Sequence, residues 1–157
     1  MESNARLYAA ARDIEIDFSK PLGFGQDGRV WQSAQKSAIK ALERLRNYTA
    51  ERDSYQRLLV ADVTQIDGLS VPRLIDFDDE LLIIEIGIVK PPYLLDFGKA
   101  HLDHPPDFSS ETMAEWEEQL VELFGDDVPR VKSLLRRLTQ FGIYYYDAKP
   151  ANIRLHA

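Results

Sequence analysis

The pattern of apolar and polar positions in the first half of the chain predicts short strands around one helix. Between residues 42 and 59, apolar side chains recur every three or four positions with charges between them, as on an amphipathic helix. Residues 4–18 mix both kinds of residue and fit either a short helix or an added strand. Four short apolar runs bounded by turn residues are strand candidates, and they lie at residues 29–31, 37–42, 71–77 and 81–88.

The second half of the chain has the pattern of helices. Lys90-Pro91-Pro92 ends the strand pattern, because proline cannot donate to a sheet ladder. Apolar positions at helical spacing predict one helix over 110–124 and another over 129–141. Ser109 or Ser110 is a suitable cap for the first helix and Asp127 for the second. Strands with one helix, followed by helices, predict an α+β fold.

Length and charge narrow the class of protein. The chain has 157 residues, the length of one ordinary domain, with a strand-rich part expected over 1–88 and a helical part over 89–157. A net charge of -7 argues against non-specific binding to nucleic acid or to an anionic membrane. The longest apolar run, 81–89, is too short to span a bilayer, and no signal peptide is visible, so we expect a cytoplasmic protein. Because cysteine is absent, disulfides and thiolate metal sites are excluded.

A glycine-rich stretch is the first candidate for chemistry. Gly23, Gly25, Gly28 and Val30 fit the pattern G-x-G-x-x-G-x-V, in which glycines let the backbone approach phosphates closely. An ordinary glycine-rich hairpin turn is the alternative. Strand residues follow the glycines where a dinucleotide-binding turn would open a helix, which favours a loop that covers phosphates between two strands.

Two charged residues further along could act together. Lys40 follows Ala38 and Ile39 on a strand candidate, and phosphate oxygens would satisfy its ammonium group. Glu51 lies on the following helix, and if it turns inward it pairs with Lys40. The alternatives are an edge-strand lysine that faces water and a glutamate on a solvated helix face.

The most specific motif lies near the end of the sequence. Asp147, Lys149 and Asn152 form D-x-K-P-x-N, followed by a short apolar strand candidate. Phosphoryl transfer needs a carboxylate to orient the attacking hydroxyl, a cation for the phosphate and an oxygen ligand for the metal. These three residues supply those three groups in this order.

Taken together, the ordered motifs from residue 22 to 155 resemble those of the eukaryotic-like protein kinase and small-molecule kinase superfamily. The resemblance implies a kinase-like fold, with an antiparallel-sheet N-lobe and a truncated helical C-lobe. It implies that ATP and Mg²⁺ are bound, that the three glycines cover the phosphates, and that Lys40, oriented by Glu51, holds the α- and β-phosphates. Val30 and Ala38 would then cover the adenine.

The same resemblance assigns the remaining roles. The carbonyl of Glu85 and the N–H of Gly87 would meet the edge of the adenine. Asp147 would be the catalytic base, Lys149 its helper on the phosphate side, and Asn152 a metal ligand. Full activity would make the chain a phosphotransferase acting on a hydroxyl acceptor. The alternatives are an inactive pseudokinase that acts as a nucleotide-binding or protein-interaction module, and an unrelated α+β protein with coincidental motifs.

The sequence departs from the family pattern in three ways. Tyr145 and Tyr146 replace the usual His-Arg before the aspartate, and the sequence stops soon after Asn152, before the place of the metal-binding Asp-Phe-Gly. Asp96-Phe97-Gly98 precedes the catalytic motif, so we interpret it as a turn; the alternatives are that Asp96 contacts ribose or completes a metal site across a dimer. Because the predicted helices would lack their usual cover, we also expect a homodimer or a protein partner.

Overall fold

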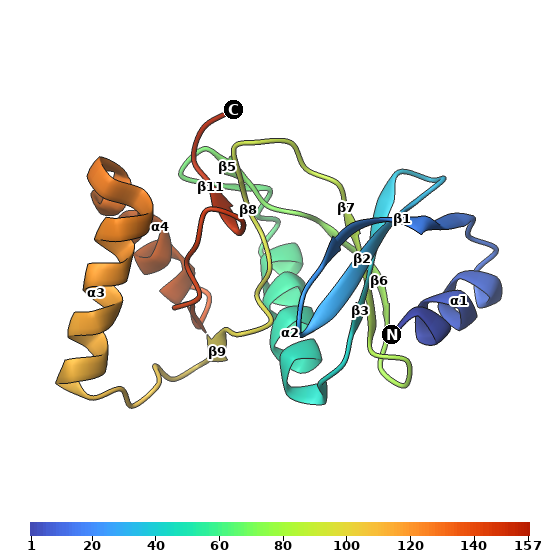
Figure 1. Ribbon diagram of the computed structural model, residues 1–157, viewed down its shortest axis with the longest axis horizontal. Helices are drawn as coiled ribbons and strands as arrows, with labels where there is room; N and C mark the ends of the chain where they lie inside the picture. The colour runs from blue at the N-terminus through green and yellow to red at the C-terminus, as the bar shows by residue number, and fades with distance from the viewer.

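The computed structural model describes residues 1–157 as an α+β fold (Figure 1). Its helices are α1 (Glu2–Ala11), α2 (Leu45–Val60), α3 (Ser110–Phe124) and α4 (Val128–Thr139), with a 3-10 turn, η1 (Gly125–Asp127), between the last two. The three helices predicted by periodicity are therefore found within a few residues of their expected bounds. The open alternative for residues 4–18 resolves as the rest of a helix followed by the start of a strand.

A five-stranded antiparallel sheet forms one end of the molecule. Its strands lie in the order β1-β2-β3-β7-β6, with β1 (Ile16–Phe24), β2 (Gly28–Ser33), β3 (Ser37–Leu42), β7 (Ile83–Gly87) and β6 (Leu74–Asp78). The strand candidates at residues 71–77 and 81–88 are found as the antiparallel β6-β7 pair. Pro21 lies in β1, an edge strand, and the register with β2 is irregular on both sides of it, which is where a sheet tolerates proline.

Strand β3 is covered on both faces, and this decides where its lysine points. Ile39 and Ala41 pack against α1, whereas Ala38 and Leu42 belong to the larger core that includes α2. Since side chains alternate along a strand, Lys40 shares the face of Ala38 and Leu42. Its ammonium is therefore directed toward the side of the sheet that α2 covers.

Short strands connect the sheet to the helical end. One four-stranded sheet has the order β11-β8-β5-β4, with β11 (Ile153–Arg154), β8 (Tyr93–Leu94), β5 (Leu69–Ser70) and β4 (Gln65–Ile66). A separate pair joins β9 (His101–Leu102) to β10 (Ile143–Tyr144). In Figure 1 these strands lie between α2 and the α3-α4 pair.

Helices α3 and α4 are covered by the chain itself. Leu134, Leu135 and Leu138 of α4 are buried in the same 24-residue core as Tyr55 of α2 and Leu120 of α3. The chain itself therefore covers these leucines, and they give no support to the expected homodimer or protein partner. The strand-rich and helical parts share this core, and the boundary near residue 88 stays a prediction.

Local capping agrees with the sequence at one helix and not at the other. Ser109 Oγ accepts a hydrogen bond from Thr112 N at 3.1 Å, as an N-cap does. Asp127 lies at the N-cap position of α4 as expected, but its side chain makes no cap bond and its carboxylate instead contacts His156 at 3.0 Å. None of the helices combines the length and the hydropathy that crossing a membrane requires.

Candidate functional site

The pairing of β8 with β11 brings two distant polar segments together. The strands are antiparallel, with Leu94 opposite Ile153, and Leu95 N donates to Asn152 O at 2.9 Å. Asp96 lies two residues after the end of β8 and Asn152 directly precedes β11, so this register puts both at the same edge. The triplet Asp96-Phe97-Gly98 is thus a turn, as expected, and it also lies beside the segment that carries Asp147.

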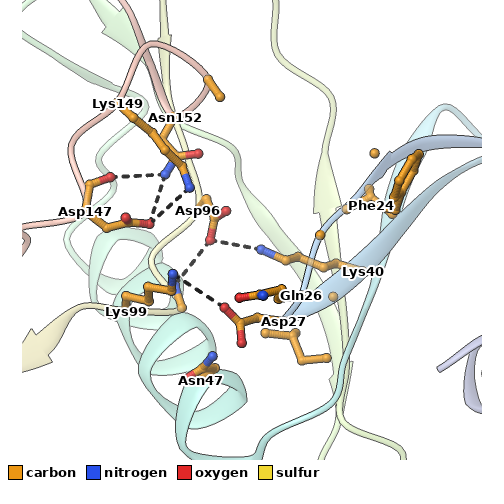
Figure 2. Close-up of a pocket in the computed structure, with 17 residues that line it drawn as sticks. Phe24, Gln26, Asp27, Lys40, Asn47, Asp96, Lys99, Asp147, Lys149 and Asn152 are labelled. Atoms are coloured by element: carbon orange, nitrogen blue, oxygen red, sulfur yellow. Dashed lines mark hydrogen bonds and ion pairs between the residues drawn. The ribbon is translucent and has the colours of Figure 1, made fainter. Parts of the chain in front are cut away.

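A cleft of about 480 Å³ lies where these segments meet the sheet (Figure 2). Its walls come from the glycine-rich loop, β3, the first turn of α2, the turn after β8 and the loop before β11. The charged residues that line it are Asp27, Lys40, Asp96, Lys99, Asp147 and Lys149. Cations and carboxylates in one concave site are typical of sites that bind charged ligands.

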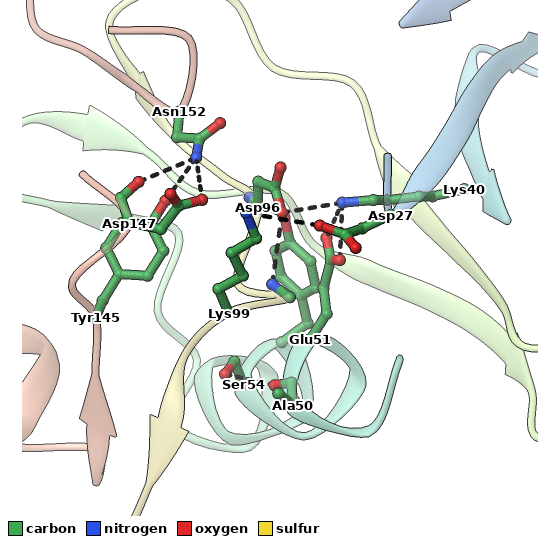
Figure 3. A network of polar contacts seen from close by, with 12 residues as sticks. Asp27, Lys40, Ala50, Glu51, Ser54, Asp96, Lys99, Tyr145, Asp147 and Asn152 are labelled. Carbon is green, nitrogen blue, oxygen red and sulfur yellow. Dashed lines mark hydrogen bonds and ion pairs between the residues drawn. The ribbon is translucent and has the colours of Figure 1, made fainter. Parts of the chain in front are cut away.

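Lys40 is held in the cleft by two carboxylates from different elements (Figure 3). Its Nζ donates to Glu51 Oε1 at 2.9 Å and to Asp96 Oδ1 at 3.1 Å, and it lies 2.8 Å from Glu51 Oε2. The Lys40 side chain is 12% exposed and that of Glu51 1%. The alternatives of a water-facing lysine and a solvated glutamate are therefore wrong, because the β3 face and the α2 face pack against each other.

The electrostatics of this triad set the charge of each member. Burial opposes the charge on Lys40, but Glu51 and Asp96 outweigh it and raise the lysine pKa above its ordinary value. Burial raises the pKa of Glu51 to about 7, because the attraction of Lys40 offsets only part of the desolvation. Burial also disfavours ionised Asp96, yet Lys40 holds its pKa below the usual range. Asp96 therefore stays ionised at neutral pH.

Gly98 permits the close approach of the Asp96 turn to α2. A Cβ at this position would lie 3.3 Å from Glu51 Oε2 and 3.6 Å from Asp96 Oδ1. The distance to Glu51 Oε2 is shorter than most Cβ contacts in proteins. The Gly98 N–H also donates to Asp96 Oδ1 at 3.4 Å. A glycine after Phe97 thus keeps both carboxylates of the triad within reach of one lysine.

Three aromatic rings tie the walls of the cleft together. Phe97 packs edge-on against Tyr55 of α2, with centroids 5.1 Å apart, and against Tyr145, with centroids 5.7 Å apart. Asp96 N donates to the Tyr55 hydroxyl at 3.2 Å. All three rings are buried, so α2, the Asp96 turn and the segment before Asp147 form one packed unit.

Asn152 orders the loop that carries Asp147. Its Nδ2 donates to the Tyr145 hydroxyl at 2.9 Å, to Asp147 O at 3.2 Å and to Asp147 Oδ2 at 3.4 Å. Asp147 Oδ2 also lies 3.6 Å from Lys149 Nζ. Because the amide nitrogen is committed to these acceptors, Oδ1 is the atom with which Asn152 could ligate a cation.

Most of the residues expected at a nucleotide site line the cleft. They are Gly23, Gly25, Gly28, Val30, Lys40, Asp147, Lys149 and Asn152, and Glu51 supports them from behind Lys40. Gly28 is required by packing, since a Cβ there would lie 2.9 Å from Ala41 O. Ala38 is not among the lining residues, because its side chain belongs to the core.

The two expected adenine contacts are not brought to the cleft. The Glu85 carboxylate lies on the α1 side of the sheet, where it accepts from Tyr8 Oη at 2.8 Å and Ser37 Oγ at 2.6 Å. The Gly87 N–H donates to Arg73 O at 2.8 Å and would have to leave that acceptor to meet a base. Neither residue lines the cleft, and their contacts with adenine stay predictions.

Sequence reasoning gave Asp96 a functional contact only as an alternative to a turn, and it missed that Asp27 and Lys99 line the cleft. The available signal for Asp96 was the triplet Asp96-Phe97-Gly98 itself, which we discounted because of its place in the chain. Asp27 and Lys99 carried no signal beyond their position next to motifs. No group of three or more His, Cys, Asp or Glu side chains is placed to hold a metal ion, so a cation here would need Asn152 or ligand oxygens as well.

Comparison with known proteins adds little to this geometry. No protein-family model and no curated protein matches the sequence. Among solved structures, the chain is similar to the ternary complex of APH(2'')-IIa with streptomycin and ATP, with 12% sequence identity and a TM-score of 0.41. The match covers 84% of this chain and 37% of that chain, so the present chain spans little more than a third of that protein's length. So slight a likeness assigns neither a family nor an activity.

Proposed function

We propose that the cleft binds ATP with Mg²⁺ and that the protein is a kinase-like phosphotransferase acting on a hydroxyl acceptor. The observation that carries the proposal is the triad in which Lys40 is fixed by Glu51 of α2 and by Asp96. A lysine held in one position by two carboxylates presents a fixed charge to a ligand anion. The glycine-rich loop forms one wall of the same cleft, and backbone N–H groups of such a loop can donate hydrogen bonds to phosphate oxygens.

The pair Asp96 and Asn152 fits the requirements of a magnesium site. Mg²⁺ prefers oxygen ligands and is often bound by one or two carboxylates together with substrate phosphates. Asp96 is ionised and 36% exposed, and Asn152 Oδ1 is not needed to order its own loop. When bound, the ion would neutralise charge on the phosphates. In this proposal both ligands come from one chain, so no second copy is needed to complete the site.

In this proposal, Asp147 accepts the proton of the acceptor hydroxyl. Its carboxylate lines the cleft, and Asn152 Nδ2 and Lys149 Nζ fix Oδ2 from two sides. In the proposed reaction the acceptor oxygen bonds to the γ-phosphorus, the bond from phosphorus to the β-phosphate oxygen breaks, and Asp147 takes the hydroxyl proton. Lys40 would hold the phosphates while Lys149 offsets charge near the acceptor.

Calorimetric titration with ATP, with and without Mg²⁺, tests the proposal. Lys40→Met should weaken binding roughly 10- to 100-fold, as expected for losing a charge-assisted contact with phosphate. Lys20→Met is the matched control, because Lys20 is 84% exposed and lies outside the cleft. Thermal unfolding of each variant checks that the fold is kept. Equal binding by both variants, or no binding by the wild type at millimolar ATP, would overturn the proposal.

The pseudokinase alternative makes a different prediction for the same samples. It expects the same Mg²⁺-dependent nucleotide binding, weakened to the same extent by Lys40→Met, but no transfer of the γ-phosphate to any hydroxyl. Transfer of radiolabel from γ-labelled ATP to the members of a panel of small alcohols and proteins, measured beside an acceptor-free sample, separates the two. Asp147→Asn is the control, since loss of its carboxylate should stop transfer and leave binding in place.

A further inference from the structure

A second lysine in the cleft has its counter-charge on the glycine-rich loop. Asp27 Oδ2 lies 3.6 Å from Lys99 Nζ, and Figure 2 shows the two side chains meeting across the opening. Asp27 precedes β2, and Lys99 directly follows the turn that carries Asp96. The contact therefore joins the two walls between which the proposed nucleotide would enter.

Lys99 differs from the other two lysines in how its charge is balanced. Lys40 is bound at hydrogen-bond distance by two carboxylates, those of Glu51 and Asp96, and Lys149 is balanced by Asp147 of its own loop. Lys99 is balanced only by Asp27, at a distance longer than a hydrogen bond and with the lysine side chain 52% exposed. An exposed ion pair of this kind contributes little free energy, so another anion can displace it easily.

Asp27 has a second cation on the outer side of the loop. Its Oδ1 lies 3.9 Å from Arg44, a residue that does not line the cleft and whose side chain is 71% exposed. The Asp27 backbone is held in place because Glu43 N donates to Asp27 O at 3.2 Å. The carboxylate can therefore leave Lys99 by a side-chain rotation and remain close to a positive charge, without moving the loop backbone.

We propose that Lys99 is a phosphate-binding residue of the cleft. In the absence of nucleotide its ammonium group pairs with the Asp27 carboxylate, and the phosphates of the nucleotide displace that carboxylate. This inference rests on the proposed function. Asp27 left in place would repel the negatively charged phosphates from a site that already contains Asp96 and Asp147. Its displacement removes this repulsion and frees one cation, so the exchange favours triphosphates over nucleosides without phosphate.

A double-mutant cycle measures the exchange through the dissociation constant of Mg²⁺-ATP. Asp27→Asn should tighten binding about two- to five-fold, the range expected for removing an exposed competing ion pair. Lys99→Met should weaken binding about five- to ten-fold, and Lys99→Arg should restore most of it. In the Lys99→Met background, Asp27→Asn should have a smaller effect, because the competition no longer exists. Inorganic triphosphate should show the same order of affinities, and adenosine should not respond to either change.

The outcomes separate this inference from the proposed function. If Lys40→Met abolishes binding but Lys99→Met binds as tightly as the wild type, Lys99 is no phosphate ligand and only this inference fails. If Asp27→Asn weakens binding in both backgrounds, Asp27 supports the loop and the competition is refuted. If the wild type binds no nucleotide, both proposals fall together. Lys20→Met remains the control for a general loss of positive charge, with equal thermal stability required of every variant.

Discussion

Lys40 Nζ lies 3.1 Å from Asp96 Oδ1, which puts the aspartate of an out-of-order Asp-Phe-Gly triplet inside the cleft. Asp96 comes before the Asp147 segment in the chain, yet the β8-β11 pairing sets it next to Asn152. In the proposed function, the carboxylate of Asp96 is the metal ligand that acts together with Asn152. A site of this kind depends on which groups meet in space and not on their order along the chain.

Replacing Asp96 tests whether it serves a cation. Asp96→Asn should weaken Mg²⁺-ATP binding by roughly ten-fold or more, because a neutral amide is a poorer magnesium ligand than a carboxylate. Binding of ATP without Mg²⁺ should stay equal or become tighter, since one negative charge is gone. Titration of ATP at several Mg²⁺ concentrations measures both effects. Asp107→Asn, on an exposed residue outside the cleft, is the control, and an unchanged Mg²⁺ dependence in Asp96→Asn would contradict the assignment.

Glu51 predicts a specific dependence of stability on pH. Burial raises its pKa to about 7 in the folded state from an ordinary value of 4.5, so the folded protein binds this proton more tightly. The stability that protonation contributes is complete below about pH 4.5 and is lost as the pH rises through about 7. The difference in unfolding free energy, wild type minus Glu51→Gln, should therefore fall between pH 5 and 8, on the order of 2 kcal/mol.

Urea unfolding of both proteins across that range makes the measurement. Lys40 and Asp96 are present in both chains, so the difference isolates the Glu51 carboxyl. A difference that grows with pH would mean that pairing with Lys40 outweighs burial at this position.

Phe97 should matter for stability far more than an exposed phenylalanine. It is fully buried between Tyr55 and Tyr145, and truncation to alanine leaves a cavity. Phe97→Ala should cost about 3–5 kcal/mol of unfolding free energy. Phe24→Ala is the matched control, because Phe24 is 80% exposed, and it should change stability by no more than about 0.5 kcal/mol. Urea unfolding measures both variants. Similar losses of unfolding free energy would show that the packing of Phe97 against Tyr55 and Tyr145 contributes little to stability.

The pairing of Lys40 with Glu51 could be predicted from the sequence because each residue lies on a strongly patterned element. Strand alternation puts Lys40 on the same face as Ala38, and helical spacing puts Glu51 in line with Tyr55. Asp96 could not be predicted in the same way. Its place depends on the two-residue strands β8 and β11, whose pairing leaves no periodic signal and joins segments far apart in sequence.

The expected adenine contacts show the limit of transferring roles by motif order. Glu85 and Gly87 lie on β7, as the sequence predicted, but β7 has neighbours on both sides in the sheet. Its backbone groups are therefore engaged by β3 and β6, and the Glu85 side chain faces α1. The apolar pattern alone was enough to predict the strand. Whether its backbone groups are free to bind adenine depends on the order of strands in the sheet, which the pattern does not give.

The glycine-rich loop offers two glycines with opposite requirements. At Gly28 an added Cβ would meet Ala41 O of the neighbouring strand at 2.9 Å, so the strands must shift apart. At Gly25 an added Cβ would meet nothing within 4 Å. Gly28→Ala should therefore lose about 1–3 kcal/mol of stability and weaken nucleotide binding, and Gly25→Ala should leave stability nearly unchanged. Unfolding by urea, followed by calorimetry with Mg²⁺-ATP, compares the two, and equal stability would show that the β2-β3 contact yields without strain.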